Sequence, residues 1–259
     1  MDPRKTLCST GEYPDAPSGS GNVIENRFQF GDRMKSLRLL AILENPGADA
    51  ALRFVEKTLG PWQVGFGSPE RHPGALPLPG PLRSFYDFAG NWPEVLCGQN
   101  QLLAPGDLIS VDEKLVFFRD GHGQLEWATS QEGDDPPVWV RRVRPVPGRW
   151  LAERDPLGRF LLATRVFEAS VGSSGTAHNP DLPPERARTA MESFTRLQLS
   201  EWTLASAMFA SDDLVAIASP TGTGPFPGRW SITIGSPSGP EPIKHVALGQ
   251  GWAISDWGA

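Results

Sequence analysis

The stretch from Asn91 to Val140 reads NWPEVLCGQNQLLAPGDLISVDEKLVFFRDGHGQLEWATSQEGDDPPVWV. Its short apolar runs are separated by turn residues rich in Gly and Asp, and they are Leu108–Val111, Lys114–Phe118, Leu125–Trp127 and Val138–Val140. Aromatic and β-branched residues between such turns are typical of strands joined by hairpins. The stretch therefore predicts a small antiparallel sheet with an acidic rim, and it contains no recognisable set of catalytic residues.

Helices are predicted around these strands. Asn45-Pro46-Gly47 introduces the amphipathic segment Ala48–Leu59, after a short strand or helix at Arg38–Leu43. A helix beginning near Pro81 places Leu82, Phe85 and Phe88 on one side. Asp155-Pro156 predicts the start of a helix over Leu157–Val171, because Asp caps free amides and Pro fits the first turn.

The second half of the chain combines one more helix with strands. Pro183-Pro184-Glu185 predicts the start of a long helix in which apolar residues keep a period close to 3.6, namely Ala187, Met191, Phe194, Leu197 and Leu204, with Trp202 and Met208 nearby. By composition, Ser173–Asn179 before it is a flexible loop. Strand patterns return at Leu214–Ala218, Arg229–Ile234 and Ile243–Trp257, and they either extend the central sheet or form a smaller second layer.

Domain organisation follows from these patterns and from composition. Residues 1–26 are rich in Gly, Ser, Pro and Asp and predict a disordered tail. No charged or low-complexity linker divides the remainder, so 27–259 is expected to be a single α+β domain with a strand-rich C-terminal extension. The chain has no apolar run near the roughly 20 residues that cross a bilayer, and we expect a cytoplasmic protein. Its two cysteines, Cys8 and Cys97, are expected to be reduced thiols.

Charge is distributed unevenly around the net value of −6. Between Asp112 and Asp135, seven acidic residues and two basic ones leave an excess of five negative charges. Between Arg141 and Arg165, seven arginines and two acidic residues leave five positive charges. One edge of the sheet is therefore expected to be acidic and a neighbouring edge basic.

An acidic rim can steer a basic partner toward the protein and raise the association rate. The predicted partner-binding residues are Asp112, Glu113, Asp120, Glu132, Asp134 and Asp135, with Trp127 as an exposed anchor. A simpler interpretation is that these acids are solvated turn residues that keep the protein soluble. The arginines are expected to face solvent, and a nucleic-acid site would need a wider basic field.

Motifs that carry chemistry are missing. The four histidines, His72, His122, His178 and His245, have no metal-ligand spacing. No serine lies in a nucleophile-elbow sequence, and the Gly-x-Gly segments lack the flanking residues that hold phosphate. We therefore expect no catalytic residue, no metal and no cofactor. We also expect a protein as the partner, rather than nucleic acid or a membrane, and the oligomeric state stays open.

The order of elements resembles the SMI1/KNR4 (SUKH) superfamily from Ala48 to about Val171. The resemblance is carried by Leu76–Tyr86, the Asn91-Trp92-Pro93 turn, Val116-Phe117-Phe118 before Asp120–Gly123, the Asp-rich turn before Pro137–Val140, and Leu157–Leu162. It implies a mostly antiparallel central sheet flanked by helices, and a non-enzymatic immunity protein that binds and neutralises a toxin with a basic domain. The alternatives are a regulatory or scaffold protein, as in the fungal members, or an enzyme with a small-molecule pocket between the sheet and the C-terminal part.

Overall fold

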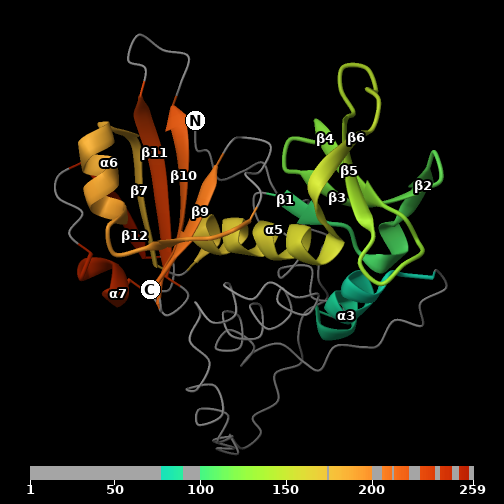
Figure 1. The fold of residues 1–259 in the computed structure, drawn as a ribbon, viewed down its shortest axis with the longest axis horizontal. Coiled ribbons are helices and arrows are strands. Elements are labelled where there is room, and N and C mark those ends of the chain that lie inside the picture. The colour runs from blue at the N-terminus through green and yellow to red at the C-terminus, as the bar shows by residue number, and fades with distance from the viewer. Residues whose placement is uncertain are drawn as a thin grey trace, which may run out of the picture. The chain divides into compact units, whose positions relative to one another are not determined.

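The computed structural model describes residues 77–89, 100–173, 175–199, 206–211, 213–221, 228–236, 240–246 and 251–256. All of them belong to one compact unit, Ser36–Ala259. The described residues form two six-stranded antiparallel sheets and several helices, which confirms the α+β class (Figure 1). The elements predicted at Arg38–Leu43 and Ala48–Leu59, the tail, both cysteines and the Asn91-Trp92-Pro93 turn lie outside the described residues.

The first sheet, called sheet A, contains all four strands predicted from the opening stretch. Its strands are β1 (Asn100–Leu102), β2 (Ile109–Val111), β3 (Lys114–Asp120), β4 (Leu125–Thr129), β5 (Pro137–Arg142) and β6 (Leu151–Pro156). A short 3₁₀ helix, η4 (Pro105–Asp107), separates β1 from β2. The order is β1-β3-β4-β5-β6, and β2 also pairs with β3. Short hairpins set this register, as the Gly and Asp turns predicted.

Two predicted helices are confirmed as α3 (Gly80–Ala89) and α5 (Leu157–Gly172). The expectation that Asp155 caps α5 is wrong, because the extended strand β6 continues through Pro156 and carries Asp155 away from the first turn. Asp135 takes that role instead: its Oδ1 accepts a hydrogen bond from the backbone N–H of Gly158 at 2.7 Å. Pairing of Pro137 with Pro156 brings the two segments together.

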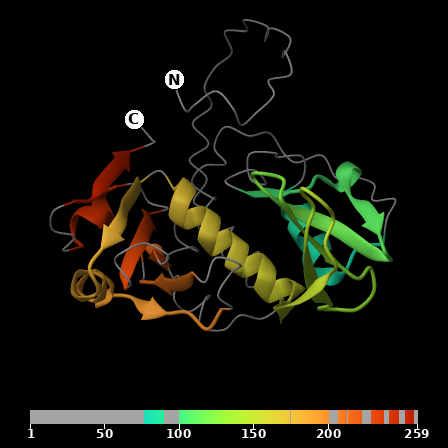
Figure 2. The same ribbon diagram turned by 90° about the horizontal axis from the view of Figure 1, so that it is seen from above.

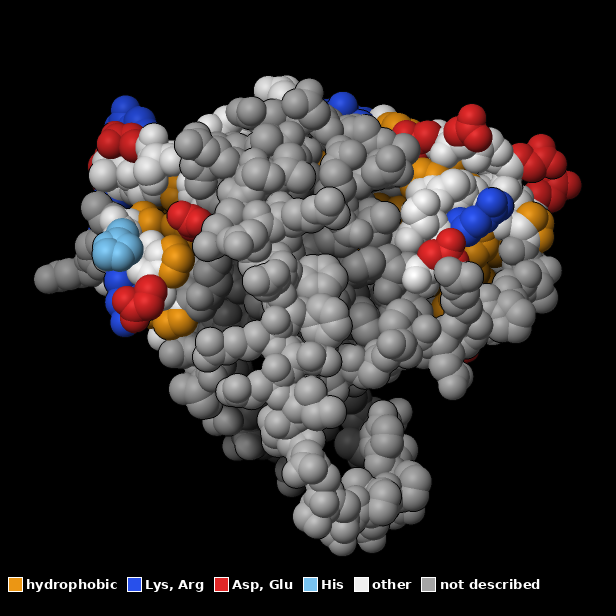
Figure 3. Space-filling view, turned by 90° about the horizontal axis from the view of Figure 1, so that it is seen from below, with side chains coloured by type: hydrophobic (Ala, Val, Ile, Leu, Met, Phe, Trp, Pro, Cys, Tyr) orange, Lys and Arg blue, Asp and Glu red, His pale blue; other side chains and the backbone are white. Residues whose placement is uncertain are grey.

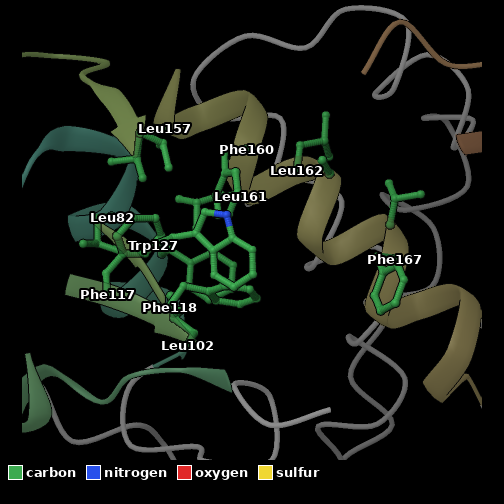
Figure 4. Packing of buried hydrophobic residues seen from close by; sticks show 14 of the residues in the cluster. Leu82, Leu102, Phe117, Phe118, Trp127, Leu157, Phe160, Leu161, Leu162 and Phe167 are labelled. Atoms are coloured by element: carbon green, nitrogen blue, oxygen red, sulfur yellow. The ribbon is translucent and has the colours of Figure 1, made fainter. Parts of the chain in front are cut away.

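The main hydrophobic core lies between α3, α5 and the inner face of sheet A. Phe160 of α5 packs against the rings of Phe117, Phe118 and Trp127, with centroid distances of 5.8, 5.8 and 6.0 Å (Figure 4). Leu82 of α3 is buried in the same cluster. Figure 2 shows α5 between the two sheets, and most of its side chains are buried, as expected of a helix that is apolar on all sides.

The second sheet, called sheet B, holds the C-terminal strands. They are β7 (Gly175–Leu182), β8 (Thr195–Arg196), β9 (Ala207–Ala210), β10 (Val215–Thr221), β11 (Arg229–Ser236) and β12 (Ala253–Asp256), in the order β12-β7-β11-β10-β9-β8. In β10, Val215 and Ile217 join the core that contains α5, whereas Ala216 and Ala218 join a second core with residues of α6 (Pro184–Met191) and α7 (Glu241–Lys244). Sheet B is thus covered by helices on both faces.

These C-terminal strands form a separate sheet with as many strands as sheet A, and not an extension of it or a smaller layer. The strands predicted at Leu214–Ala218 and Arg229–Ile234 are confirmed as β10 and β11. The segment Ile243–Trp257 was predicted to have a strand pattern. Its described residues begin within α7 and include the strand β12.

Two predictions for the second half are wrong. The helix that starts at Pro184 ends at Met191, and Leu197 and Leu199 are then buried on either side of the exposed Gln198. This is a period of two, which a few apolar residues can also present at helical spacing. The predicted loop Ser173–Asn179 instead forms most of β7, whose residues 175–177 are all buried.

Small residues are needed in sheet B because α5 approaches it closely. A Cβ atom on Gly235 of β11 would lie 2.7 Å from the Cα of Ser170 and clash with the carbonyl oxygen of Ala169. Thr176 of β7 pairs with Gly235, and residues paired across two strands share a face. The loop-like composition of this segment therefore reflects close packing of a helix on a sheet.

Among the described residues, no helix combines the length and hydrophobicity required to cross a bilayer.

Candidate functional site

Sheet A has a second face that points away from α5. Phe118, Trp127 and Val140 are paired across β3, β4 and β5, and the ring contacts of Phe118 and Trp127 with Phe160 assign this row to the inner face. Side chains alternate along a strand, so the neighbouring rows lie on the opposite, outer face. One outer row is Ile109–Val116–Ala128–Trp139–Ala152, and the next is Gln101–Arg119–Glu126–Arg141.

The charged side chains of the second row form an ion cluster. Arg141 contacts the carboxylate of Glu126 through Nε at 2.7 Å and Nη2 at 2.5 Å, and Arg119 lies 3.7 Å from the same carboxylate. The side chains of Glu126 and Arg141 are only 3% and 13% exposed. A buried ion pair of this geometry fixes both side chains, since removing either would leave the other charge uncompensated.

Two tryptophans of the outer face are each contacted by a basic side chain. Arg141 stacks over the ring of Trp150 at 4.4 Å, and Lys114 lies over the ring of Trp139 at 4.7 Å. Trp150 Nε1 donates a hydrogen bond to Asp112 Oδ2 at 3.1 Å, and Arg141 Nη1 lies 3.5 Å from the same oxygen. Both rings remain half-buried, so the outer face presents aromatic surface in a fixed arrangement.

Apolar and acidic side chains border these tryptophans. Ile109, at one end of the first outer row, is 42% exposed, although Val116 and Ala128 in the middle of that row are buried. The side chain of Asp112 is 67% exposed, and Glu113 beside it is exposed as well. Asp112 and Glu113 form the turn between β2 and β3 with φ values of 50° and 63°, a conformation that Asp tolerates better than most residues.

The structure separates one predicted acidic residue, Asp120, from Glu132, Asp134 and Asp135. Asp120 follows the last pair of β3 with β4, whereas Glu132, Asp134 and Asp135 follow the other end of that ladder. At about 3.3 Å per residue, the seven residues of β3 separate these ends by about 20 Å. Figure 3 shows several acidic side chains at the margin of the part that carries α3 and sheet A.

Two of these acids have structural roles. Asp120 Oδ1 accepts backbone hydrogen bonds from Gln124 at 2.6 Å and from Leu125 at 2.8 Å, which closes the turn between β3 and β4. Asp135 caps α5, as described above. The acids that remain for a partner are Glu113, Glu132 and Asp134, together with Asp112, which also accepts the hydrogen bond of Trp150; all four are exposed.

The expectation that Trp127 is an exposed anchor is wrong, because the side chain is 1% exposed and faces α5. Its Nε1 donates a hydrogen bond to Glu153 Oε1 at 2.9 Å. Burial raises the pKa of Glu153 and nearby Asp155 adds to this, while the hydrogen bond from Trp127 opposes it. The partially exposed tryptophans of this sheet are Trp139 and Trp150, which were not selected from the sequence. The sequence offered one indication of this: on a strand, Trp127 points to the opposite face from Glu126 and Ala128.

The basic run is only partly solvent-facing. Arg142, Arg144, Arg149 and Arg154 are exposed, as expected. Arg165 is buried with its guanidinium 5.5 Å from the ring of Phe85, and Arg159 pairs with Asp155 at 3.4 Å. The last two side chains are directed into the fold because α5 places them against α3 and β6.

The described histidines are dispersed. His122 and His245 are exposed, and His178 Nδ1 lies 2.9 Å from Thr233 Oγ1. Within the described ranges, no three His, Cys, Asp or Glu side chains are grouped closely enough to hold a metal ion.

Comparison of the chain with protein-family models, curated proteins and solved structures finds no match. Its function is therefore inferred from its own residues and geometry.

Proposed function

We propose that this chain is a SUKH-type protein that acts in the cytoplasm by binding another protein. In this proposal it is an immunity protein, and it neutralises a toxin by covering the active site or a required surface of that toxin. Support comes from the family resemblance, which extends from Ala48 to about Val171, and from the outer face of sheet A. The outer face is the single observation that carries the proposal.

The outer face has the properties of a binding hot spot. Trp and Arg contribute most often to binding energy, and Trp139, Trp150 and Arg141 lie together there. Their stacking, hydrogen bond and ion pairs fix them before a partner arrives, which lowers the entropy lost on binding. A stable complex buries about 800 Å² per partner, so the contact would extend beyond the tryptophans.

The exposed acids would serve encounter and orientation. Asp112 and Glu113 lie beside Trp150, and Glu132 and Asp134 are on the loop between β4 and β5. Carboxylates at the rim of an interface attract a basic partner and raise its association rate, with little effect on dissociation. Enzymes that act on nucleic acid are commonly basic, and this fits the toxin class that the resemblance implies.

The decisive experiment expresses each gene adjacent to this one in a heterologous host, with and without this chain. We expect one neighbour to arrest growth and this chain to restore it. The variant Trp150→Ala should abolish protection, and the double reversal Glu113→Lys/Asp134→Lys should slow association of the purified proteins at low salt. Circular dichroism would verify that both variants fold.

A matched control reverses one exposed acid on α6 and one directly after it, Glu185→Lys/Glu192→Lys, with the same change in net charge. Equal loss of protection in this control would mean that net charge, and not the outer face, governs binding. Growth arrest without protection would refute immunity. A non-toxic partner that requires Trp150 would favour the regulatory or scaffold alternative, and turnover of a small molecule would favour the enzyme.

A further inference from the structure

The connection between β5 and β6 carries a second charged surface. This basic loop, residues 142–150, has the sequence RVRPVPGRW, and Arg142, Arg144 and Arg149 in it are exposed. None of the three forms an ion pair with a described residue. Val146 at its centre is 71% exposed, more than the other large hydrophobic side chains that the structure describes. The loop thus surrounds an exposed apolar side chain with three positive charges.

Both ends of the basic loop are held in place. The backbone N–H of Val143 donates to the carbonyl of Gln124 at 2.7 Å, and that of Gly148 donates to the carbonyl of Arg142 at 2.8 Å. Pro145 and Pro147 restrict the backbone between these bonds. At its end, Trp150 is fixed by Asp112 and Arg141. A loop held in this way loses less conformational entropy when it inserts into a partner.

Negative charge lies directly beside this positive loop. Asp112 accepts the hydrogen bond of Trp150, and Glu113 is its neighbour in the chain. A complementary partner therefore presents carboxylates to the loop and basic groups to the turn between β2 and β3. Enzymes that hydrolyse phosphate esters with metal ions have this distribution, because carboxylates bind the metals inside a basic substrate surface.

We infer that the basic loop inserts into a carboxylate-lined recess of the partner, with Val146 buried at its centre and the three arginines paired to acidic side chains. This inference rests on the proposed function and specifies the partner as an enzyme whose acidic active site is set in a basic surface. A nucleic acid is a poorer occupant, since the net charge is −6 and Asp112 and Glu113 would repel phosphates next to the loop.

Photo-crosslinking of the full chain tests the inference in the native cell and in the host that expresses the toxic neighbour. p-Benzoylphenylalanine replaces Val146 in one sample and the exposed Ile254 of sheet B in a control. We expect Val146, but not Ile254, to crosslink to a protein peptide rich in Asp and Glu. The yield should fall about tenfold in Arg142→Ser/Arg144→Ser/Arg149→Ser and be retained in the corresponding lysine variant. Arg188→Ser on α6 is expected to leave it unchanged.

Three results would overturn the inference: a crosslinked product that nuclease degrades, an attached peptide without acidic residues, or a yield unaffected by the arginine substitutions. A probe at Glu113 separates this failure from failure of the proposed function. If Glu113 crosslinks to a partner and Val146 does not, the chain binds its partner without the basic loop. If neither position crosslinks and growth is not restored, both proposals fail.

Discussion

Sheet A and sheet B are equal in strand number but differ in how their faces are covered. Sheet B packs against α5 on one face and against α6 and α7 on the other, and its strands alternate between two apolar cores. Sheet A packs against α3 and α5 on its inner face, and its outer face carries an ion cluster, two half-buried tryptophans and exposed acids.

The side chains of the two sheets therefore have different roles. In sheet B, small residues such as Gly235 allow close packing of α5. In sheet A, the charged row on the outer face fixes aromatic groups that are still accessible at their edges. Sheet B therefore has an apolar core on each face, whereas the outer face of sheet A remains partly accessible, as the proposed binding requires.

The largest expected effect comes from breaking the buried ion pair of sheet A. Glu126→Ala leaves Arg141 without its nearest carboxylate and should lower the free energy of unfolding by about 3 to 5 kcal/mol. The double variant Glu126→Leu/Arg141→Met should recover much of this loss, because neither buried charge remains, and the charges that lose a contact, Arg119 and Asp112, are 40% and 67% exposed. Urea denaturation provides both values.

The exposed ion pair of Lys244 and Glu241 lies on α7, which packs against sheet B, and it is the matched control for the buried pair. Glu241→Gln should leave stability nearly unchanged, because solvent screens exposed ion pairs. Similar losses in Glu126→Ala and Glu241→Gln would contradict the difference between the two sheets.

A smaller loss tests the close packing in sheet B. Gly235→Ala places a methyl group against the backbone of α5 and should destabilise the protein by about 2 to 3 kcal/mol. Gly172→Ala, near the end of α5, has no atom within 4 Å of the added carbon and serves as control. Because Gly235 belongs to sheet B and the outer face to sheet A, Gly235→Ala should retain the proposed partner binding at temperatures where it is folded. An unchanged melting temperature would show that β11 and α5 are not in close contact.

A third test separates the acidic residues of sheet A that stabilise the fold from those proposed to contact a partner. Asp120→Ala and Asp135→Ala remove acceptors of backbone hydrogen bonds and should each cost about 1 kcal/mol of stability. Glu132→Ala and Asp134→Ala should leave the melting temperature within error and slow association with the partner. If Glu132→Ala and Asp134→Ala instead lower the melting temperature and leave association unchanged, the partner requires the conformation of the loop between β4 and β5 and not its charge.

The sequence predicted sheet A well because its signals are local. Turns such as Asp120–Gly123 lie between short apolar runs, so hairpin pairing needed no information from distant residues. For sheet B the prediction failed where packing overrode composition. Gly175 and Thr176 are typical of a loop, but they form a strand, and α5 lies close to the face that Thr176 shares with Gly235.

The candidate site was predicted less well, since side-chain contacts cannot be read from charge alone. The excess of negative charge indicated this sheet, but it did not separate Asp112 on the outer face from Asp120 in a turn. Arg141 was read as a solvent-facing residue, although pairing of β4 with β5 buries it against Glu126. The tryptophan that was selected, Trp127, alternates to the inner face.

The smallest expected effect concerns the inner face of sheet A and depends on pH. Burial raises the pKa of Glu153, so the folded protein holds this proton more tightly than the unfolded chain does. The resulting stabilisation is complete below the ordinary carboxyl pKa of 4.5 and is lost as pH rises through the raised pKa.

Glu153→Gln does not titrate and keeps an oxygen that can accept a hydrogen bond from Trp127 Nε1. Its free energy of unfolding should therefore exceed that of the wild type at neutral pH and approach it in acid, as measured by urea denaturation across this range. Glu192→Gln, directly after α6, supplies the exposed control. If the difference in free energy of unfolding between Glu153→Gln and wild type does not vary with pH, the pKa of Glu153 is not raised. The hydrogen bond from Trp127 would then offset the effect of burial.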